Sequence, residues 1–327
     1  MPDTPENQGE YPQVYNQEPG LGFPIARVGA IISLACGAIL NLGVCKYAGK
    51  GQGEVSLLRT LWDILRPGDI LLTDCLLANW TNLWLLQERG IALVSRLNKA
   101  HRTADFRRGK RLGPRDHIVR WFKPTSIRSL DRPAYQTLGE YVTIRETKIR
   151  VRQPGFRTRS IVVVTTLLDP QQTTKEDLAT LYRARWHNEL DVRSIKATMQ
   201  MRELRCKTPE LVRKEIWTHV LAYNLLRTIM AQAAAKHAIL PRSISFKGSL
   251  QILEAFQPVL ELGTASDAAR RLRVYQELLI AIASHRIADR PDRYEPRAKK
   301  RRRNHSAWLT KPRAEIKREM AKGVSKI

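Results

Sequence analysis

Four side chains able to bind a metal ion or a phosphate recur at helical spacing in the string YRARWHNELDVRSIK. They are Tyr182, Arg185, Glu189 and Lys196. At about 100° per residue they fall within an arc of roughly 60° on a helical wheel, with Arg193 just beside it. A carboxylate among cations stays ionised at neutral pH, which suits a ligand of a hard metal ion beside a phosphodiester. The alternative is a solvated face with ordinary Glu–Arg and Glu–Lys pairs.

The spacing Tyr, two residues, Arg, three residues, Glu, six residues, Lys resembles the signature of the DDE transposases of bacterial insertion sequences, in the IS-four-type group. The signature falls on the four positions without a gap. GDILLTDC around Asp74 resembles the strand that bears the second catalytic Asp of this family, and residues 204–227 resemble its helical segment after the Glu. The resemblance implies an α/β, ribonuclease-H-like fold with a β-rich insertion and a helical C-terminal region. It also implies DNA cleavage and strand transfer by metal-dependent phosphoryl transfer.

The resemblance assigns roles to individual residues. Asp74 and Glu189 are expected to be catalytic metal ligands, with Mg²⁺ as the cofactor and Mn²⁺ able to substitute. Contacts to DNA phosphates are expected from Tyr182, Arg185, Arg193 and Lys196. Taken alone, Asp74 could equally cap a helix or a turn, and Tyr182 could equally pack in the core.

The chain departs from the family pattern at its start. MPDT matches a Pro-Asp-Thr that follows the first catalytic Asp, so Asp3 matches a later, noncatalytic Asp and the strand with the first Asp would end just before Met1. We therefore expect no first catalytic Asp in this chain, and a truncated, inactive copy. The missing strand is central in a ribonuclease-H-like sheet, so its neighbours are expected to have open apolar edges. Cys75 and Leu77 also depart from the Arg and the aromatic residue usual after the second Asp.

Basic residues are in large excess. Among 327 residues, 56 Lys and Arg stand against 31 Asp and Glu, a formal net charge of +25 at pH 7. Residues 95–132 hold 12 basic and 3 acidic side chains, and residues 286–327 hold 15 and 5. Such a balance favours a nucleic-acid partner over a membrane surface. With the resemblance, the expected partner is double-stranded DNA, both transposon ends and target, with a homodimer on the DNA.

Cysteine usage and hydropathy exclude other classes. No C-x-x-C pair occurs among Cys36, Cys45, Cys75 and Cys206. This argues against a zinc site or a disulfide framework and favours a reducing cytoplasm. The polar N-terminus is no signal peptide. The apolar run Gly29–Val44 contains Asn41 and is shorter than the roughly 20 residues of a membrane span, so it predicts a buried β-hairpin and no membrane partner.

Apolar periodicity predicts alternating strands and helices before residue 98. Strands are expected over 26–36, 38–47, 70–74 and 91–97, and helices over 54–65 and 79–89. A β-hairpin is expected from residues 141–152 and 161–168, turned at Gln153-Pro154-Gly155-Phe156. Thr173 to Glu176 offers a capping box for the signature helix. Thr208 and Pro209 begin a helix to about Lys236, and weaker helical patterns cover 250–256 and 265–283.

These elements suggest five parts of the chain. They are a truncated first part of a ribonuclease-H-like domain (1–98), a basic β-rich insertion (99–168), a second catalytic part with the signature helix (169–236), a helical C-terminal region (237–285) and a basic tail expected to be disordered (286–327).

Two other functions compete with an active transposase. A noncatalytic DNA-binding remnant could coat DNA or interfere with an intact transposase by co-assembly, and the missing first Asp favours it. An unrelated basic RNA-binding protein is disfavoured, because the sequence has no aromatic RNP pattern, KH loop or zinc knuckle.

Overall fold

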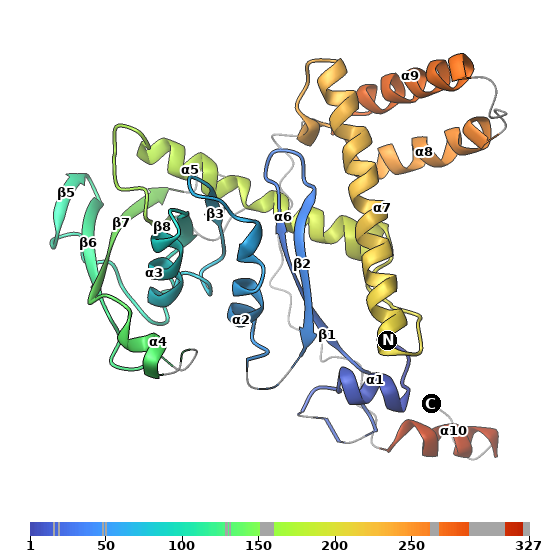
Figure 1. The fold of residues 1–327 in the computed structure, drawn as a ribbon, viewed down its shortest axis with the longest axis horizontal. Coiled ribbons are helices and arrows are strands. Elements are labelled where there is room, and N and C mark those ends of the chain that lie inside the picture. The colour runs from blue at the N-terminus through green and yellow to red at the C-terminus, as the bar shows by residue number, and fades with distance from the viewer. Residues whose placement is uncertain are drawn as a thin grey trace. The chain divides into compact units, whose positions relative to one another are not determined.

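The computed structural model describes residues 1–15, 17–18, 20–47, 49, 51–127, 130, 132–150, 160–261, 268–287 and 311–322. The chain forms two compact units. The sheet unit comprises residues 58–186, and the helical unit combines residues 1–57 with the described residues from His187 onwards (Figure 1).

Six strands form the sheet unit, in the order β3-β4-β8-β7-β6-β5. β3 and β4 are parallel and are connected through α3, whereas all other neighbours are antiparallel. The elements are η1 (Trp62–Ile64), β3 (Ile70–Leu72), α3 (Trp80–Glu88), β4 (Ala92–Arg96), β5 (Lys110–Gly113), β6 (Asp116–Phe122), α4 (Arg132–Gln136), β7 (Tyr141–Arg150), β8 (Ser160–Thr165) and α5 (Lys175–Ala184). A helical crossover between parallel strands is the usual α/β connection.

Helix α5 packs against the sheet through a small hydrophobic cluster. Its only fully buried side chain is Leu178. The cluster consists of Leu178, Val94, Ile149, Ile161 and Val163, with Leu72 and Tyr182 packed at its border. Thr174 caps the helix, and a capping box pairs it with Asp177. The predicted box began one residue earlier, at Thr173, and the structure corrects it because Thr174 is the last residue in an extended conformation.

The helical unit is organised around the long helix α7, which begins at the N-cap Thr208 as the sequence predicted. The elements are α1 (Pro5–Glu10), β1 (Ala26–Ile32), β2 (Ile39–Lys46), α6 (Trp186–Arg193), the π-helical turn η2 (Ser194–Thr198), α7 (Pro209–Lys236), η3 (Pro241–Ser243), α8 (Phe246–Glu261), α9 (Ala268–Ser284) and α10 (Arg313–Ala321). The boundaries between the units fall within two helices, α2 (Glu54–Arg59) and α6, after its first residue. Figure 1 shows the β1–β2 hairpin beside α7, and α8 and α9 near the end of α7.

The buried face of α7 forms the core of the helical unit. It contributes Val212, Ile216, Val220, Tyr223, Leu226 and Met230, and these side chains meet others from β2, α8 and α9. The predicted hairpin is confirmed, because β1 pairs with β2 in antiparallel register from Ala26–Lys46 to Ile32–Ile39. The hairpin was expected to be buried, but only Ile31, Ile39 and Leu42 of its two strands are. Among the described residues, no helix has the length and apolar character needed to cross a membrane.

Several elements differ from the predictions. No strand was predicted between residues 97 and 141, where the structure has β5 and β6; the seven residues of β6 pair with β7 from Asp116–Thr147 to Phe122–Tyr141. A helix, α1, lies within the first 24 residues, where no element was predicted. Another, α10, lies within the tail that we expected to be disordered; there Arg313 binds Asp3 at 2.8 Å, a partner that local sequence does not reveal. The predicted turn at residues 153–156 lies outside the described residues.

The units divide the chain differently from our five parts. Residues 1–57 join those after His187 because the β1–β2 hairpin packs on α7. Within the described residues, β1 pairs only with β2, and β3 only with β4. A missing central strand between β1 and β3 stays a prediction.

Candidate active site

The signature string forms three helical segments, so the prediction of one continuous helix is wrong. Arg185 separates α5 from α6, and its amide donates to the Tyr182 carbonyl at 3.2 Å, a tighter turn than in an α-helix. After α6, the amide of Met199 donates to the carbonyl of Ser194 at 3.0 Å, which closes the π-helical turn. Because a π-turn holds one residue more than an α-turn, the regular step of the helix does not continue to Lys196.

In the sheet unit, the first two signature residues, Tyr182 and Arg185, lie near the segment that contains Asp74. Burial raises the pKa of the Tyr182 phenol, and the guanidinium groups of Arg185 and Arg96 act in the opposite direction. The Arg185 Cζ lies 5.9 Å from the centre of the Tyr182 ring. Cys75, the residue after Asp74, also acts on the Tyr182 phenol and raises its pKa. Two arginines, a phenol and the Asp74 segment therefore share one region of the sheet unit.

Asp74 lies two residues beyond the end of β3, and its side chain is exposed. Its Oδ1 accepts a hydrogen bond from the Leu76 amide at 3.0 Å. Its carbonyl accepts from the Ser95 hydroxyl at 2.5 Å, and the Thr73 amide donates to the Val94 carbonyl at 3.0 Å. The backbone of this segment is thus attached to β4, while the carboxylate faces solvent.

The helical unit carries the second half of the signature. Glu189, Arg193 and Lys196 are all exposed. Arg193 and Lys196 border a hollow of about 1030 Å³, together with Arg202 and apolar side chains that include Phe23. Glu189 does not border this hollow. The structure therefore brings two of the three predicted phosphate-binding cations together, beside Arg202.

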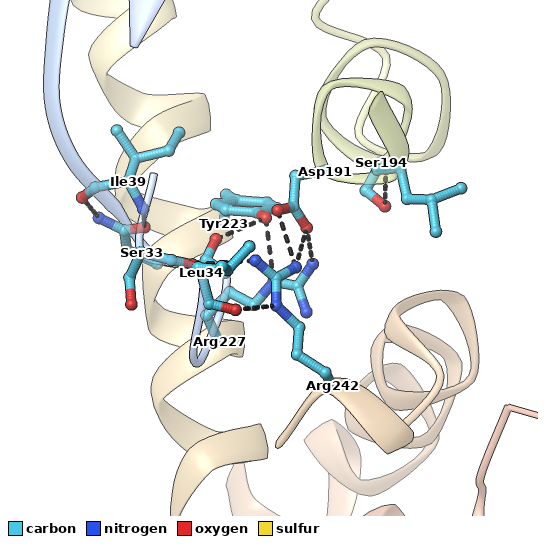
Figure 2. Close-up of polar contacts among 11 residues, drawn as sticks. Ser33, Leu34, Ile39, Asp191, Ser194, Tyr223, Arg227 and Arg242 are labelled. Atoms are coloured by element: carbon cyan, nitrogen blue, oxygen red, sulfur yellow. Dashed lines mark hydrogen bonds and ion pairs between the residues drawn. The ribbon is translucent and has the colours of Figure 1, made fainter. Parts of the chain in front are cut away.

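The opposite side of α6 is buried and charged (Figure 2). Asp191 is fully buried. It forms ion pairs with Arg227 of α7 at 2.5 Å and with Arg242 of η3 at 2.8 Å. Tyr223 lies beside this group, accepting from the Arg227 Nε at 3.0 Å and donating to the Gly37 carbonyl at 2.8 Å. Helix α6 is thus held by charge on one side and presents Glu189 on the other.

This buried group changes the titration of its neighbours. Burial raises the pKa of Tyr223 to about 12, so its hydroxyl remains a donor at neutral pH. The pKa of His187, one turn before Asp191, is lowered instead. The main cause is burial, and the charge of Arg242 lowers the pKa further. Its imidazole is therefore uncharged at neutral pH.

The described residues meet the requirements of a divalent metal site only in part. In the described part of the chain, no three His, Cys, Asp or Glu side chains are grouped so that they could hold a metal ion. Asp74 and Glu189 offer the carboxylate oxygens that Mg²⁺ prefers. They belong to different units, so their approach in space stays a prediction. Asp74 and Glu189 are the two carboxylates to which the resemblance assigns this role.

Two residues of interest escaped the sequence reasoning. Arg96 ends β4, and within the described residues its buried Nε has no hydrogen-bond partner; a charged residue at the end of an apolar strand was its signal in the sequence. Asp191 gave no signal, because its partners lie 36 and 51 residues away.

Comparisons with known proteins identify a family that this chain matches. The family model described as "Transposase DDE domain" matches residues 38–225, a range that contains Asp74 and the whole signature. The chain is also 30% identical over 257 residues to "Transposase InsG for insertion sequence element IS4" of Escherichia coli (strain K12). This match covers 76% of the chain and 54% of the relative. The chain thus spans about half the length of this curated relative.

Proposed function

We infer what the chain does from the family to which it belongs, the DDE transposases of the IS4 type. The proposal is that residues 1–327 bind double-stranded DNA and hold a divalent metal ion through Asp74 and Glu189. The observation that carries it is the complete Tyr-Arg-Glu-Lys signature downstream of Asp74, within the range that matches the family.

Each residue has a separate role in the proposal. Asp74 and Glu189 are the metal ligands, and a bound Mg²⁺ or Mn²⁺ would activate the attacking oxygen and neutralise charge at the scissile phosphate. Arg185 and Arg96, whose charges both act on the Tyr182 phenol, offer guanidinium groups to one phosphate beside it. Contacts to further phosphates come from Arg193 and Lys196, beside the hollow in the helical unit.

A second candidate function is a noncatalytic DNA-binding remnant. No residue of this chain matches the first Asp of the family, and two carboxylates position a pair of metal ions less well than three. We therefore propose that residues 1–327 alone bind DNA without cutting it. Added to an intact transposase of the same family, the chain should lower the yield of cleaved ends by co-assembly.

The test is binding and cleavage of DNA that carries the ends of the element. We expect a mobility shift that depends steeply on salt, and no cleavage with either Mg²⁺ or Mn²⁺. An absence of binding at low salt would refute the proposal. Robust Mg²⁺-dependent cleavage, lost on Glu189→Gln and retained on the matched change Glu176→Gln, would support Glu189 as a ligand. It would also show that another residue supplies the third carboxylate and that the chain is active.

A further inference from the structure

The charged group behind α6 ties this helix to three other elements. Arg242 of η3 contributes Nη1 to both carboxylate oxygens of Asp191, at 2.8 Å each. Its Nε donates to the Leu34 carbonyl and its Nη2 to the Ser33 carbonyl, both at 2.9 Å. Arg227 adds the link to α7. A single carboxylate on α6 is thereby connected to α7, to η3 and to the turn between β1 and β2 (Figure 2).

The turn is shaped to admit the two guanidinium groups. Gly37 has φ +83°, a left-handed conformation that favours glycine. A Cβ at this position would lie 2.8 Å from the Arg227 Cζ and 2.9 Å from the Arg242 Nη1. No side chain fits there unless the arginines move. The backbone of the turn therefore lies directly against the two guanidinium groups.

The position of Asp191 on α6 relates it to Glu189. Two residues apart on an α-helix correspond to about 200° of rotation, so the two carboxylates point to nearly opposite sides. Asp191 is fully buried and Glu189 is exposed, as this rotation requires. Arg193 is a further two residues on and returns to the exposed side. Whatever fixes the rotation of α6 at Asp191 also fixes the direction of Glu189.

We propose that Asp191, held by Arg227 and Arg242, is a positioning residue that sets the rotation of α6 and so aims Glu189. This inference rests on the proposed role of Glu189 as a metal ligand. A buried ion pair adds little stability compared with apolar side chains of similar volume, because the desolvation of the charges offsets their attraction. Its distinct contribution is directional, since the planar guanidinium of Arg242 bonds Asp191 through Nη1 while its Nε and Nη2 are held by the Leu34 and Ser33 carbonyls. The π-helical turn begins directly after α6, so the ion pairs of Asp191 lie within one turn of the change in hydrogen-bond register.

The first experiment measures the geometry without any metal or DNA. Nitroxide labels are attached through Glu189→Cys and through Leu221→Cys on the exposed side of α7, both in the helical unit. The native cysteines are first replaced by serine: Cys36, Cys45, Cys75 and Cys206. Double electron–electron resonance should give a narrow distribution of distances between the two labels. This distribution should broaden or shift when Asp191→Asn is added. Arg242→Lys keeps the charge and loses the planar group that joins Asp191 to the Ser33 and Leu34 carbonyls, so it should broaden the distribution to a lesser degree.

A matched control separates positioning from loss of stability. Asp116 and Arg145 form another buried ion pair, at 2.6 Å, in the sheet unit. Asp116→Asn removes the same charge in the same chemical way and should lower the melting temperature comparably. It should leave the distance distribution of the label pair unchanged. If Asp191→Asn leaves the distribution as narrow as this control does, the inference is overturned.

The second experiment uses Mn²⁺ binding to the full chain, followed by electron paramagnetic resonance. Asp191→Asn should raise the half-saturating Mn²⁺ concentration about tenfold or more, as for other residues that orient a metal ligand. Asp116→Asn should leave it within about twofold of the unmodified chain, since it touches no proposed ligand. Unchanged Mn²⁺ binding in Asp191→Asn, in a chain where Glu189→Gln does weaken it, would contradict the inference. If Glu189→Gln itself has no effect, the proposed function fails, and the label distances still decide whether Asp191 sets the rotation of α6.

Discussion

Removal of positive charge from the β5–β6 hairpin should reduce the salt dependence of DNA binding. Lys110, Arg111 and Arg115 are exposed on this hairpin, within the basic stretch that the sequence singled out. The perturbation is their combined replacement by glutamine. Because the side chains are exposed, the change should leave the sheet intact, and circular dichroism checks this.

The magnitude follows from counterion release. Each cation that neutralises one phosphate contributes about 0.9 to the slope of log K against log salt, so three cations contribute at most about 2.7. Between about 50 and about 200 mM salt, a slope change of 2.7 corresponds to about 40-fold in affinity. The variant should therefore bind more weakly at low salt and lose less of its affinity as salt rises.

Fluorescence anisotropy with a labelled duplex at several salt concentrations gives the slope. The matched control removes the same charge from α9, by Arg270→Gln, Arg271→Gln and Arg273→Gln. We expect the control to change the slope by less than half as much as the hairpin variant. Equal changes in the two variants would show that net charge, rather than the hairpin, governs binding. An unchanged slope in the hairpin variant would refute the reasoning outright.

Three further changes test the architecture. Tyr223 has a folded-state pKa raised to about 12, so it stabilises the fold below its ordinary pKa of about 10, and up to about 2.7 kcal/mol is lost as pH rises from 10 to 12; Tyr223→Phe should remove that part of the alkaline destabilisation in denaturant titrations, and an identical profile would contradict it. Thr174→Ala removes the cap of α5 and should lower the free energy of unfolding of the sheet unit by about 1 kcal/mol, while Thr174→Ser should lower it by less. Gly37→Ala should lower the melting temperature of the helical unit, because its Cβ meets the Arg227 guanidinium, and an unchanged melting temperature would mean that the turn can move.

Local sequence was sufficient where an element depends on its own residues. Helix α7 could be predicted because Thr208 and Pro209 give its start and apolar periodicity gives its length. The β1–β2 hairpin could be predicted because its apolar run is too short to span a membrane and contains Gly37 between the strands. The signature residues were found because their spacing resembles the signature of a known family.

The remaining features depend on residues far apart in the chain. The burial of Asp191 requires Arg227 and Arg242, and nothing near position 191 distinguishes it from a solvated aspartate. Helix α10 is attached through Arg313 to Asp3, 310 residues away. The π-helical turn at Ser194 reflects a choice between hydrogen-bond registers that residue types do not determine.

Iron-directed cleavage of the protein backbone tests the central claim, that Asp74 and Glu189 share one metal site. Fe²⁺ with ascorbate and peroxide generates hydroxyl radicals at the bound ion, and these cut the nearest backbone. In the presence of DNA we predict cuts near both Asp74 and Glu189, both suppressed by excess Mg²⁺ and both lost in either Asp74→Asn or Glu189→Gln. The matched change Glu176→Gln should leave both cuts in place. Cuts near only one of the two residues, or two cuts that each survive loss of the other carboxylate, would contradict a shared site.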